Sequence, residues 1–319
     1  RDPFNDSRAA QRKYLAQAWT PKLADPVRSA ARKLLASTEI EDQQQGAFML
    51  EAVGLPTDAP ALIEALTAAT LRASRVAPET DAYPTPRGAM MELLRATKML
   101  VSRGLVARPR PATLGELVVW LVALDGGARP GGWEVELGKL LKHDVSYLRE
   151  LALTHAPNAL PASLHPAVVA NLGHTDVDVQ VAAALLAANA KLVQLAPSVV
   201  NAMRRATGLR LSIISQAAYH LGARVDRIDM LIVRLADKAV FDHALSELCS
   251  VLAYDGRSMT NGKPTDAERA AVIPHWKKLA VTHRADIESG TKIALTAATP
   301  SLLPPQWKLG RPGGGGEWP

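Results

Sequence analysis

Apolar side chains recur along this chain at helical spacing, in short runs separated by polar or proline-containing linkers. Within the segment 172–189 the pattern conflicts with itself. Val177, Val179 and Val181 alternate with polar residues as they would in a β-strand, whereas the Ala- and Leu-rich run 182–188 is typical of a buried helix. The choice between strand and helix therefore depends on the neighbouring segments.

An internal repeat decides that choice. The sequence 165–176 aligns with 196–207 at an offset of 31 residues, and self-similarity at a fixed period indicates a repeat architecture. Capping-type residues follow nearly the same period, each between two short apolar helix patterns: Asp144, Asp176, Thr207 and Asp237. The repeat predicts four pairs of helices, in which Thr175 or Asp176 caps a second helix that begins near 177.

The second helix of these pairs resembles that of HEAT repeats, which typically reads Asp-x-x-Val-Arg-x-x-Ala-Ala-x-Ala-Leu. The matching residues are Asp176, Val179, Gln180, Ala183 and Ala184, and in the preceding pair Asp144, Leu148, Arg149 and Ala152. Partial matches lie at 25–35 and 216–222, whereas Gln180 replaces the expected arginine and the sequence after Asp237 is irregular. The resemblance is clear over 133–253 and looser over 15–290. It implies a fold and supplies no catalytic residue.

We therefore expect an all-α protein, an α-solenoid of HEAT-like helical hairpins with a Pro/Gly-rich irregular C-terminal tail. Three parts are expected, in chain order: degenerate HEAT-like hairpins over 1–125, a repeat array over 133–298 and the tail over 299–319. In the first part we expect 25–37 to pair with 42–53, and 60–72 with 87–103. A capping-box pattern from Thr113 to Glu116 opens a buried helix over 114–124.

Composition agrees with helices that pack through small side chains. Of the 319 residues 48% are hydrophobic but only 4% are aromatic, so Ala, Leu and Val must build the core. The single cysteine, Cys249, excludes an internal disulfide and a cysteine-based metal cage. Apolar runs are far shorter than the roughly 20 residues that cross a bilayer, so no membrane span is expected. The chain begins at Arg1 rather than Met, which favours export after loss of a leader and leaves a cytoplasmic location open.

The sequence predicts no catalytic, cofactor-binding or metal-binding residue. The glycine-rich stretch 126–132 lacks the Gly-Lys-Ser/Thr ending of a phosphate-binding loop and is interpreted as a linker. Histidines adjoin acids at 143–144, 174–176 and 242–243, but no metal-binding His-x-x-x-His or His-Glu-x-x-His motif occurs. No Gly-x-Ser-x-Gly motif accompanies the serines. We therefore expect a non-enzymatic protein, with an enzyme of scattered active-site residues left open.

Basic clusters are the main candidate binding residues, in a chain of formal net charge +6. Equivalent positions of successive solenoid repeats line one face, which predicts a basic binding face. Its members are Arg204, Arg205, Arg210, Arg234 and Lys238. Other basic clusters lie between Arg8 and Lys33 and between Arg95 and Arg110. Aromatic residues for stacking nucleic-acid bases are scarce, so a merely solvated face remains an alternative.

The tail carries large apolar side chains, which would be exposed to water unfavourably if the segment were free. They are Leu302, Leu303, Trp307 and Trp318. One interpretation is a disordered end. The other is that Leu302, Leu303 and Trp307 dock on a neighbouring subunit or on the last helix of the same chain.

The leading hypothesis for function is a non-enzymatic scaffold that binds another protein within a larger assembly. The alternative is a HEAT-like protein that binds nucleic acid through its basic face, with a role in DNA repair, as some HEAT-like proteins are DNA glycosylases. No cofactor is expected, and the sequence leaves the partner, the compartment and the oligomeric state open.

Overall fold

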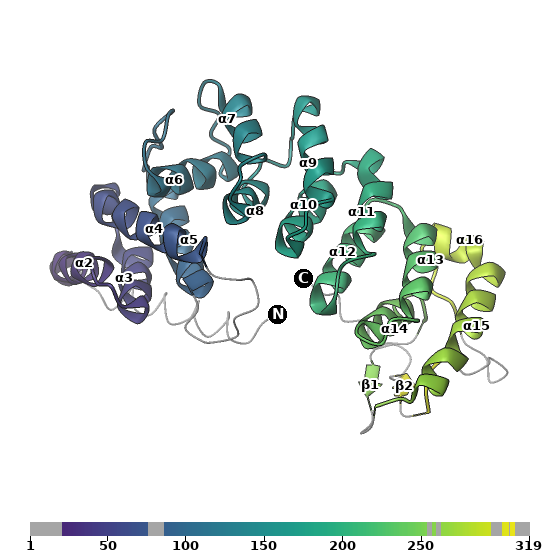
Figure 1. Ribbon diagram of the computed structural model, residues 1–319. Helices are drawn as coiled ribbons and strands as arrows, with labels where there is room; N and C mark the ends of the chain where they lie inside the picture. The colour runs from purple at the N-terminus through teal and green to yellow at the C-terminus, as the bar shows by residue number, and fades with distance from the viewer. Residues whose placement is uncertain are drawn as a thin grey trace. The chain divides into compact units, whose positions relative to one another are not determined.

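The computed structural model describes residues 21–75, 86–253, 257–259, 263–294, 302–305 and 307–309 (Figure 1). Helices dominate these residues, so the fold is all-α as the apolar pattern predicts. Contacts divide the chain into two compact units, which we call unit 1 (Arg1–Pro161) and unit 2 (Ala162–Trp318).

Unit 1 contains seven α-helices among its described residues. They are α2 (Pro21–Leu35), α3 (Ile40–Val53), α4 (Ala59–Ala73), α5 (Pro86–Ser102), α6 (Leu114–Asp125), α7 (Trp133–Leu140) and α8 (Ser146–Thr154), with a short 3-10 helix η1 (Pro56–Asp58). The predicted neighbours α2 and α3 are in contact, as are α4 and α5. Alternate helices also touch, α2 with α4, α4 with α6 and α6 with α8. The unit is therefore built from helices that contact both their sequence neighbours and the next helix but one.

Helix α6 begins where the sequence predicts. The Thr113 hydroxyl accepts a hydrogen bond from the backbone N–H of Glu116 at 3.2 Å, and the Glu116 carboxylate accepts one from the N–H of Ala112 at 2.7 Å. Gly115 then lets α6 approach α4 closely, since a Cβ at this position would lie 2.0 Å from the carbonyl oxygen of Ile63. The missing side chain of Gly115 thus determines how closely α6 packs against α4.

Unit 2 continues with helices and adds two short strands. Its described elements are η2 (Ala162–Leu164), α9 (His165–Leu172), α10 (Val177–Asn189), η3 (Val193–Leu195), α11 (Ala196–Ala202), α12 (Gly208–His220), α13 (Arg224–Arg234), α14 (Phe241–Cys249), β1 (Arg257–Met259), α15 (Asp266–Thr282), α16 (Arg284–Ser289) and β2 (Trp307–Leu309). The strands pair antiparallel, with Ser258 opposite Lys308. No pattern in the sequence predicted this strand pair.

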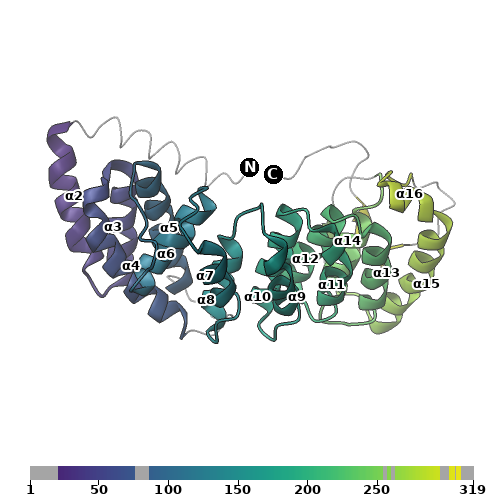
Figure 2. The ribbon, with the colours of Figure 1, turned by 90° about the horizontal axis from the view of Figure 1, so that it is seen from above.

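The helices of unit 2 form two rows (Figure 2). The first helices of successive pairs contact each other, α9 with α11 and α11 with α13. The second helices do the same, α10 with α12 and α12 with α14. Ala183, Ala184 and Ala187 of α10 are completely buried, as expected for a helix packed between neighbours.

The ambiguous segment 177–189 is helix α10, and Asp176 caps it by accepting a hydrogen bond from the N–H of Asp178 at 2.9 Å. The other predicted caps behave differently. Thr207 stands at the N-cap of α12 but accepts no capping bond. Predictions for Asp144 and Asp237 are wrong, because Val145 is the N-cap of α8 and α14 begins only at Phe241.

Histidines bind the backbone just before helices α8 and α10. Nδ1 of His143 accepts a hydrogen bond from the N–H of Val145 at 3.0 Å, and Nδ1 of His174 accepts one from the N–H of Asp176 at the same distance. The carbonyl oxygens of these histidines accept hydrogen bonds from Arg149 and Gln180 respectively. All these residues repeat at an offset of 31 positions, so Gln180 keeps the bond of the arginine that it replaces.

Candidate functional site

The predicted basic face is only partly accessible. Arg204 and Arg205 are exposed in the linker between α11 and α12, and Lys238 is exposed in the linker between α13 and α14. Arg210 is half-buried and pairs with Asp178 of α10, with 2.7 Å between Nε and Oδ1. Three exposed cations of the predicted set therefore remain, Arg204, Arg205 and Lys238.

Arg234 does not contribute to an accessible face, because its side chain is 8% exposed and bonded to the protein. The guanidinium donates to the carbonyl oxygens of Met203 at 3.2 Å, of Ala206 at 2.9 Å and of Arg204. It also lies 3.3 Å from a carboxylate oxygen of Asp237. Arg234 thereby joins the linker before α12 to the linker before α14, a structural role that the spacing of charges did not indicate.

A second arginine with such a role lies in unit 1. Nη1 of Arg103 donates to the carbonyl oxygen of Gly54 at 2.7 Å, and Nη2 donates to those of Glu51 and Ala52, each at 3.0 Å. These carbonyls end helix α3, where backbone acceptors lack partners within the helix. Burial lowers the pKa of Arg103, and the charge of Glu51 opposes this shift. Arg103 therefore caps α3 instead of extending a basic surface.

Other members of the basic clusters in unit 1 are also paired. Arg32 lies 2.7 Å from the buried carboxylate of Asp58, and Arg108 lies 3.0 Å from Glu116. Arg8 and the other cluster members before residue 21 lie outside the described residues. Many residues of these basic clusters are therefore used in contacts within the fold.

The described part of the tail packs against unit 2. Leu302 is buried, and its carbonyl oxygen accepts a hydrogen bond from Nε1 of Trp276 in α15 at 2.8 Å. Trp307 is also buried and meets Phe241 of α14 edge to face, with 6.4 Å between ring centroids. Leu303 is half-buried, and Trp318 lies outside the described residues. In the structure, Leu302 and Trp307 contact helices α15 and α14 of the same chain.

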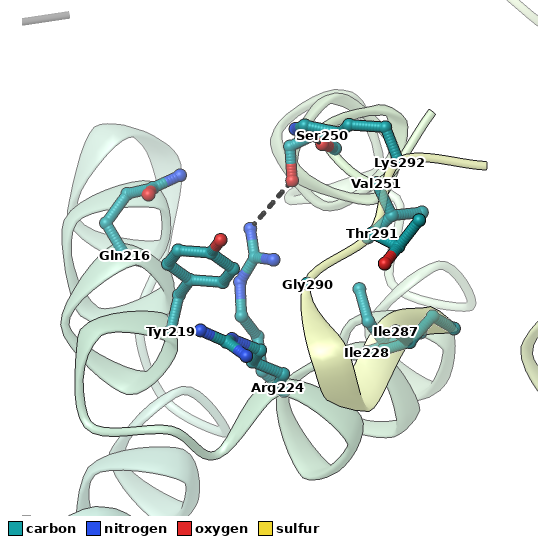
Figure 3. Close-up of a pocket in the computed structure, with 11 residues that line it drawn as sticks. Gln216, Tyr219, Arg224, Ile228, Ser250, Val251, Ile287, Gly290, Thr291 and Lys292 are labelled. Atoms are coloured by element: carbon teal, nitrogen blue, oxygen red, sulfur yellow. Dashed lines mark hydrogen bonds between the residues drawn. The ribbon is translucent and has the colours of Figure 1, made fainter. Parts of the chain in front are cut away.

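A cavity of about 140 Å³ lies in unit 2 (Figure 3). Tyr219 of α12 and Arg224 of α13 stand side by side at one side of it, and Thr291 and Lys292, which follow α16, stand across from them. Gln216, Arg227 and Ser250 also belong to its polar lining. The cavity is about as large as the engineered cavity of roughly 150 Å³ that admits benzene.

The chain after α16 is positioned by a glycine and by backbone pairing. Gly290 ends α16 in the left-handed region with φ of 81°, and a Cβ there would lie 3.2 Å from Cζ of Arg224. Ile293 then pairs with the end of α14, donating to the carbonyl of Val251 at 2.9 Å and accepting from the N–H of Ala253 at 2.8 Å. Lys292 is thereby fixed beside the cavity, where its Nζ donates to the carbonyl oxygen of Ser250.

Arg227 contributes hydrogen-bond donors to the cavity but little net charge. Its side chain is 2% exposed and Nη2 lies 2.8 Å from Oε2 of Glu247. Nε donates to Ser215 Oγ at 2.7 Å, and Nη2 also donates to Ser250 Oγ at 3.1 Å, the bond dashed in Figure 3. Burial lowers the pKa of Arg227, and the charge of Glu247 opposes that shift. The pair is therefore a neutral unit in the interior.

Arg224 and Lys292 differ from Arg227 because no carboxylate in the described part of the chain pairs with either of them. Nη1 of Arg224 donates to the carbonyl oxygen of Glu288 at 2.9 Å, and its Cζ lies 5.1 Å from the centroid of the Tyr219 ring. Nε of Arg224 is buried and donates to no described group. Among the described residues, the site thus holds two positive charges with no paired carboxylate.

The predicted basic face did not include Arg224 or Arg227, and no pattern in the sequence identified this cavity. Lys292 and Tyr219 belong to segments that only tertiary packing brings together, so no local pattern could have joined them to Arg224. The described residues contain no group of three or more His, Cys, Asp or Glu side chains arranged to hold a metal ion. None of the described helices is long and apolar enough to span a membrane.

Comparisons with known proteins give no relative. No family model matches the chain, and no curated protein or solved structure matches it. The internal repeat is therefore described from the chain's own residues: the 31-residue offset and the hydrogen bonds that recur with it.

Proposed function

We propose that this chain is a non-enzymatic, HEAT-like α-solenoid scaffold that binds another protein within a larger assembly. The observation that carries the proposal is the double row of helices in unit 2, where α9, α11 and α13 contact in order and α10, α12 and α14 do the same. Such stacking brings equivalent faces of successive repeats side by side, which is how helical-repeat proteins form extended binding surfaces.

Exposed apolar side chains on the second helices support a protein partner. Leu185 on α10 is 42% exposed and Leu209 on α12 is 69% exposed, although α10 and α12 otherwise bury most of their apolar residues. Contact with a partner would remove these leucines from water at a gain of roughly 25 cal/mol for each Å² buried. We propose that the partner contacts this part of unit 2.

The test is co-purification from nuclease-treated extracts of cells that produce the chain. We expect the unmodified chain to retain a second polypeptide and the variant Leu185→Glu/Leu209→Glu to lose it. Val281→Glu is the control, because Val281 is 77% exposed on α15 and lies away from both leucines in sequence. The proposal is wrong if the unmodified chain retains no second polypeptide, or if the double variant retains it as well as the control does.

Nucleic-acid binding is a second candidate, favoured by the exposed cations Arg204, Arg205 and Lys238 on two linkers that Arg234 joins. A role in DNA repair would follow only from this candidate. Binding of duplex DNA that falls steeply with salt and is lost in Arg204→Glu/Arg205→Glu would favour it over the scaffold. The scaffold proposal expects no such binding at physiological salt.

A further inference from the structure

We propose that the cavity lined by Tyr219, Arg224 and Lys292 binds a phosphoryl group, either inorganic phosphate or a phosphate ester. This inference is independent of the protein partner proposed above. It rests on the charge of the cavity, on its donors and on the way in which the fold holds them in place.

The charge of the cavity matches a dianion. None of its eleven lining residues is an Asp or Glu, and three of them are cations, Arg224, Arg227 and Lys292. Oε2 of Glu247, which does not line the cavity, lies 2.8 Å from Nη2 of Arg227 and neutralises the charge of this arginine. Two positive charges remain, and a phosphate ester carries −1.5 to −2 charges at about pH 7. A carboxylate, with one negative charge, would leave half of this charge uncompensated.

The donors of the cavity outnumber its acceptors. The Arg224 guanidinium and the Lys292 ammonium can only donate hydrogen bonds, and Tyr219, Thr291 and Ser250 carry hydroxyl groups beside them. Nε of Arg224, which lines the cavity, is buried with no described partner. A phosphoryl group offers three strong acceptor oxygens to such a set of donors.

The fold holds both cations before any ligand arrives. Arg224 stacks on Tyr219 and donates to Glu288 O at 2.9 Å, while Lys292 donates to Ser250 O. The absence of a side chain at Gly290 leaves room for Arg224, because a Cβ at position 290 would lie 3.2 Å from Cζ of Arg224. Fixed side chains lose little conformational entropy on binding, so a small anion can bind without reorganisation of the site.

The experiment is isothermal titration calorimetry of the full chain with inorganic phosphate, O-phosphoserine and acetate at about 0.15 M salt, the physiological screening condition. We expect saturable binding of a phosphate-bearing probe and at least about tenfold weaker binding in Arg224→Gln and in Lys292→Gln, since each removes a charge-assisted contact. The tighter of the two phosphate probes indicates whether the ligand is free phosphate or an ester. Acetate should bind far more weakly than either.

The matched control is Arg284→Gln, an exposed arginine of α16 that does not line the cavity and lies 4.0 Å from Asp229. It should bind phosphate as the unmodified chain does. Tyr219→Phe, which keeps the ring under Arg224 and removes only the hydroxyl, provides a second variant should a charge variant misfold, and circular dichroism checks folding in all of them. Absence of saturable binding by both phosphate probes overturns the proposal, as does equal binding in control and cavity variants or acetate binding as tight as that of phosphate.

Discussion

The guanidinium of Arg227 lies 2.8 Å from the carboxylate of Glu247 in the interior of unit 2, where both side chains are almost fully buried. Ser215 and Gln216 of α12 donate to the same carboxylate at 3.1 and 2.8 Å. The ion pair therefore connects α12, α13 and α14, three helices from two successive pairs. Its arginine also lines the cavity described above.

Removing one charge of this pair should destabilise unit 2 strongly. We expect Glu247→Gln to lower the free energy of unfolding by about 3–5 kcal/mol, because it leaves the Arg227 charge buried without a partner. Urea denaturation followed by circular dichroism measures this loss. The double variant Arg227→Met/Glu247→Leu should be more stable than Glu247→Gln, and the opposite order would contradict the interpretation.

Asp125 predicts a pH dependence of stability in unit 1. His155, whose Nδ1 lies 3.5 Å from Asp125 Oδ2, lowers the pKa of this carboxyl group; burial opposes the shift and Lys98 adds to it. A pKa lowered by folding stabilises the folded chain above the unfolded pKa of about 3.9, and the gain is lost as the pH falls through the folded value.

We therefore expect Asp125→Asn to be less stable than the unmodified chain at neutral pH by no more than about 1 kcal/mol, since the pair is partly exposed. Thermal unfolding at a series of pH values measures the difference. It should persist down to about pH 4 and disappear below it. A difference that stays constant to the acid limit would show that the carboxylate charge is not responsible.

Arg234→Gln should destabilise the chain more than Arg204→Gln does. Arg234→Gln removes hydrogen bonds to three linker carbonyls, and we expect a loss of about 1–3 kcal/mol because buried acceptors remain unsatisfied. Arg204→Gln, at an exposed position of the same linker, should change stability by less than about 0.5 kcal/mol. Equal effects in chemical denaturation would contradict the structural role assigned to Arg234.

Trp307 should contribute to the stability of unit 2. Trp307→Ala is expected to cost about 3–5 kcal/mol, because it deletes a buried ring that packs against Phe241. Protection of the Trp276 environment in α15 should fall at the same time, and hydrogen exchange measures it. A variant as stable as the unmodified chain would mean that the tail does not pack on unit 2 in solution.

The helix pairs of unit 2 were predictable from the positions of prolines and from the 31-residue repeat, and both can be read directly from the sequence. Pro166 and Pro197 lie in the first turns of α9 and α11, where a missing N–H costs no hydrogen bond. The 31-residue offset also identified 177–189 as a helix, against its strand-like alternation of valines. Local chemistry and repeat position agreed here, and both were visible in the sequence.

The caps and the site were less predictable for a physical reason. Asp144 has the right residue type for a cap, but it lies one residue before the N-cap position of α8, which Val145 occupies. Arg234 has the charge expected of a binding residue, but its guanidinium donates to backbone carbonyls within the fold. Arg224 and Lys292 meet only through tertiary packing. The sequence shows which polar groups are present, but it does not show which groups contact each other in the folded chain.

The proposed binding of another protein can be measured as the mass of the nuclease-treated native complex in light scattering after size exclusion. We expect a second polypeptide at fixed stoichiometry and a return to the mass of one free chain in Leu185→Glu/Leu209→Glu. An unmodified chain that elutes alone, or only with copies of itself, would contradict it.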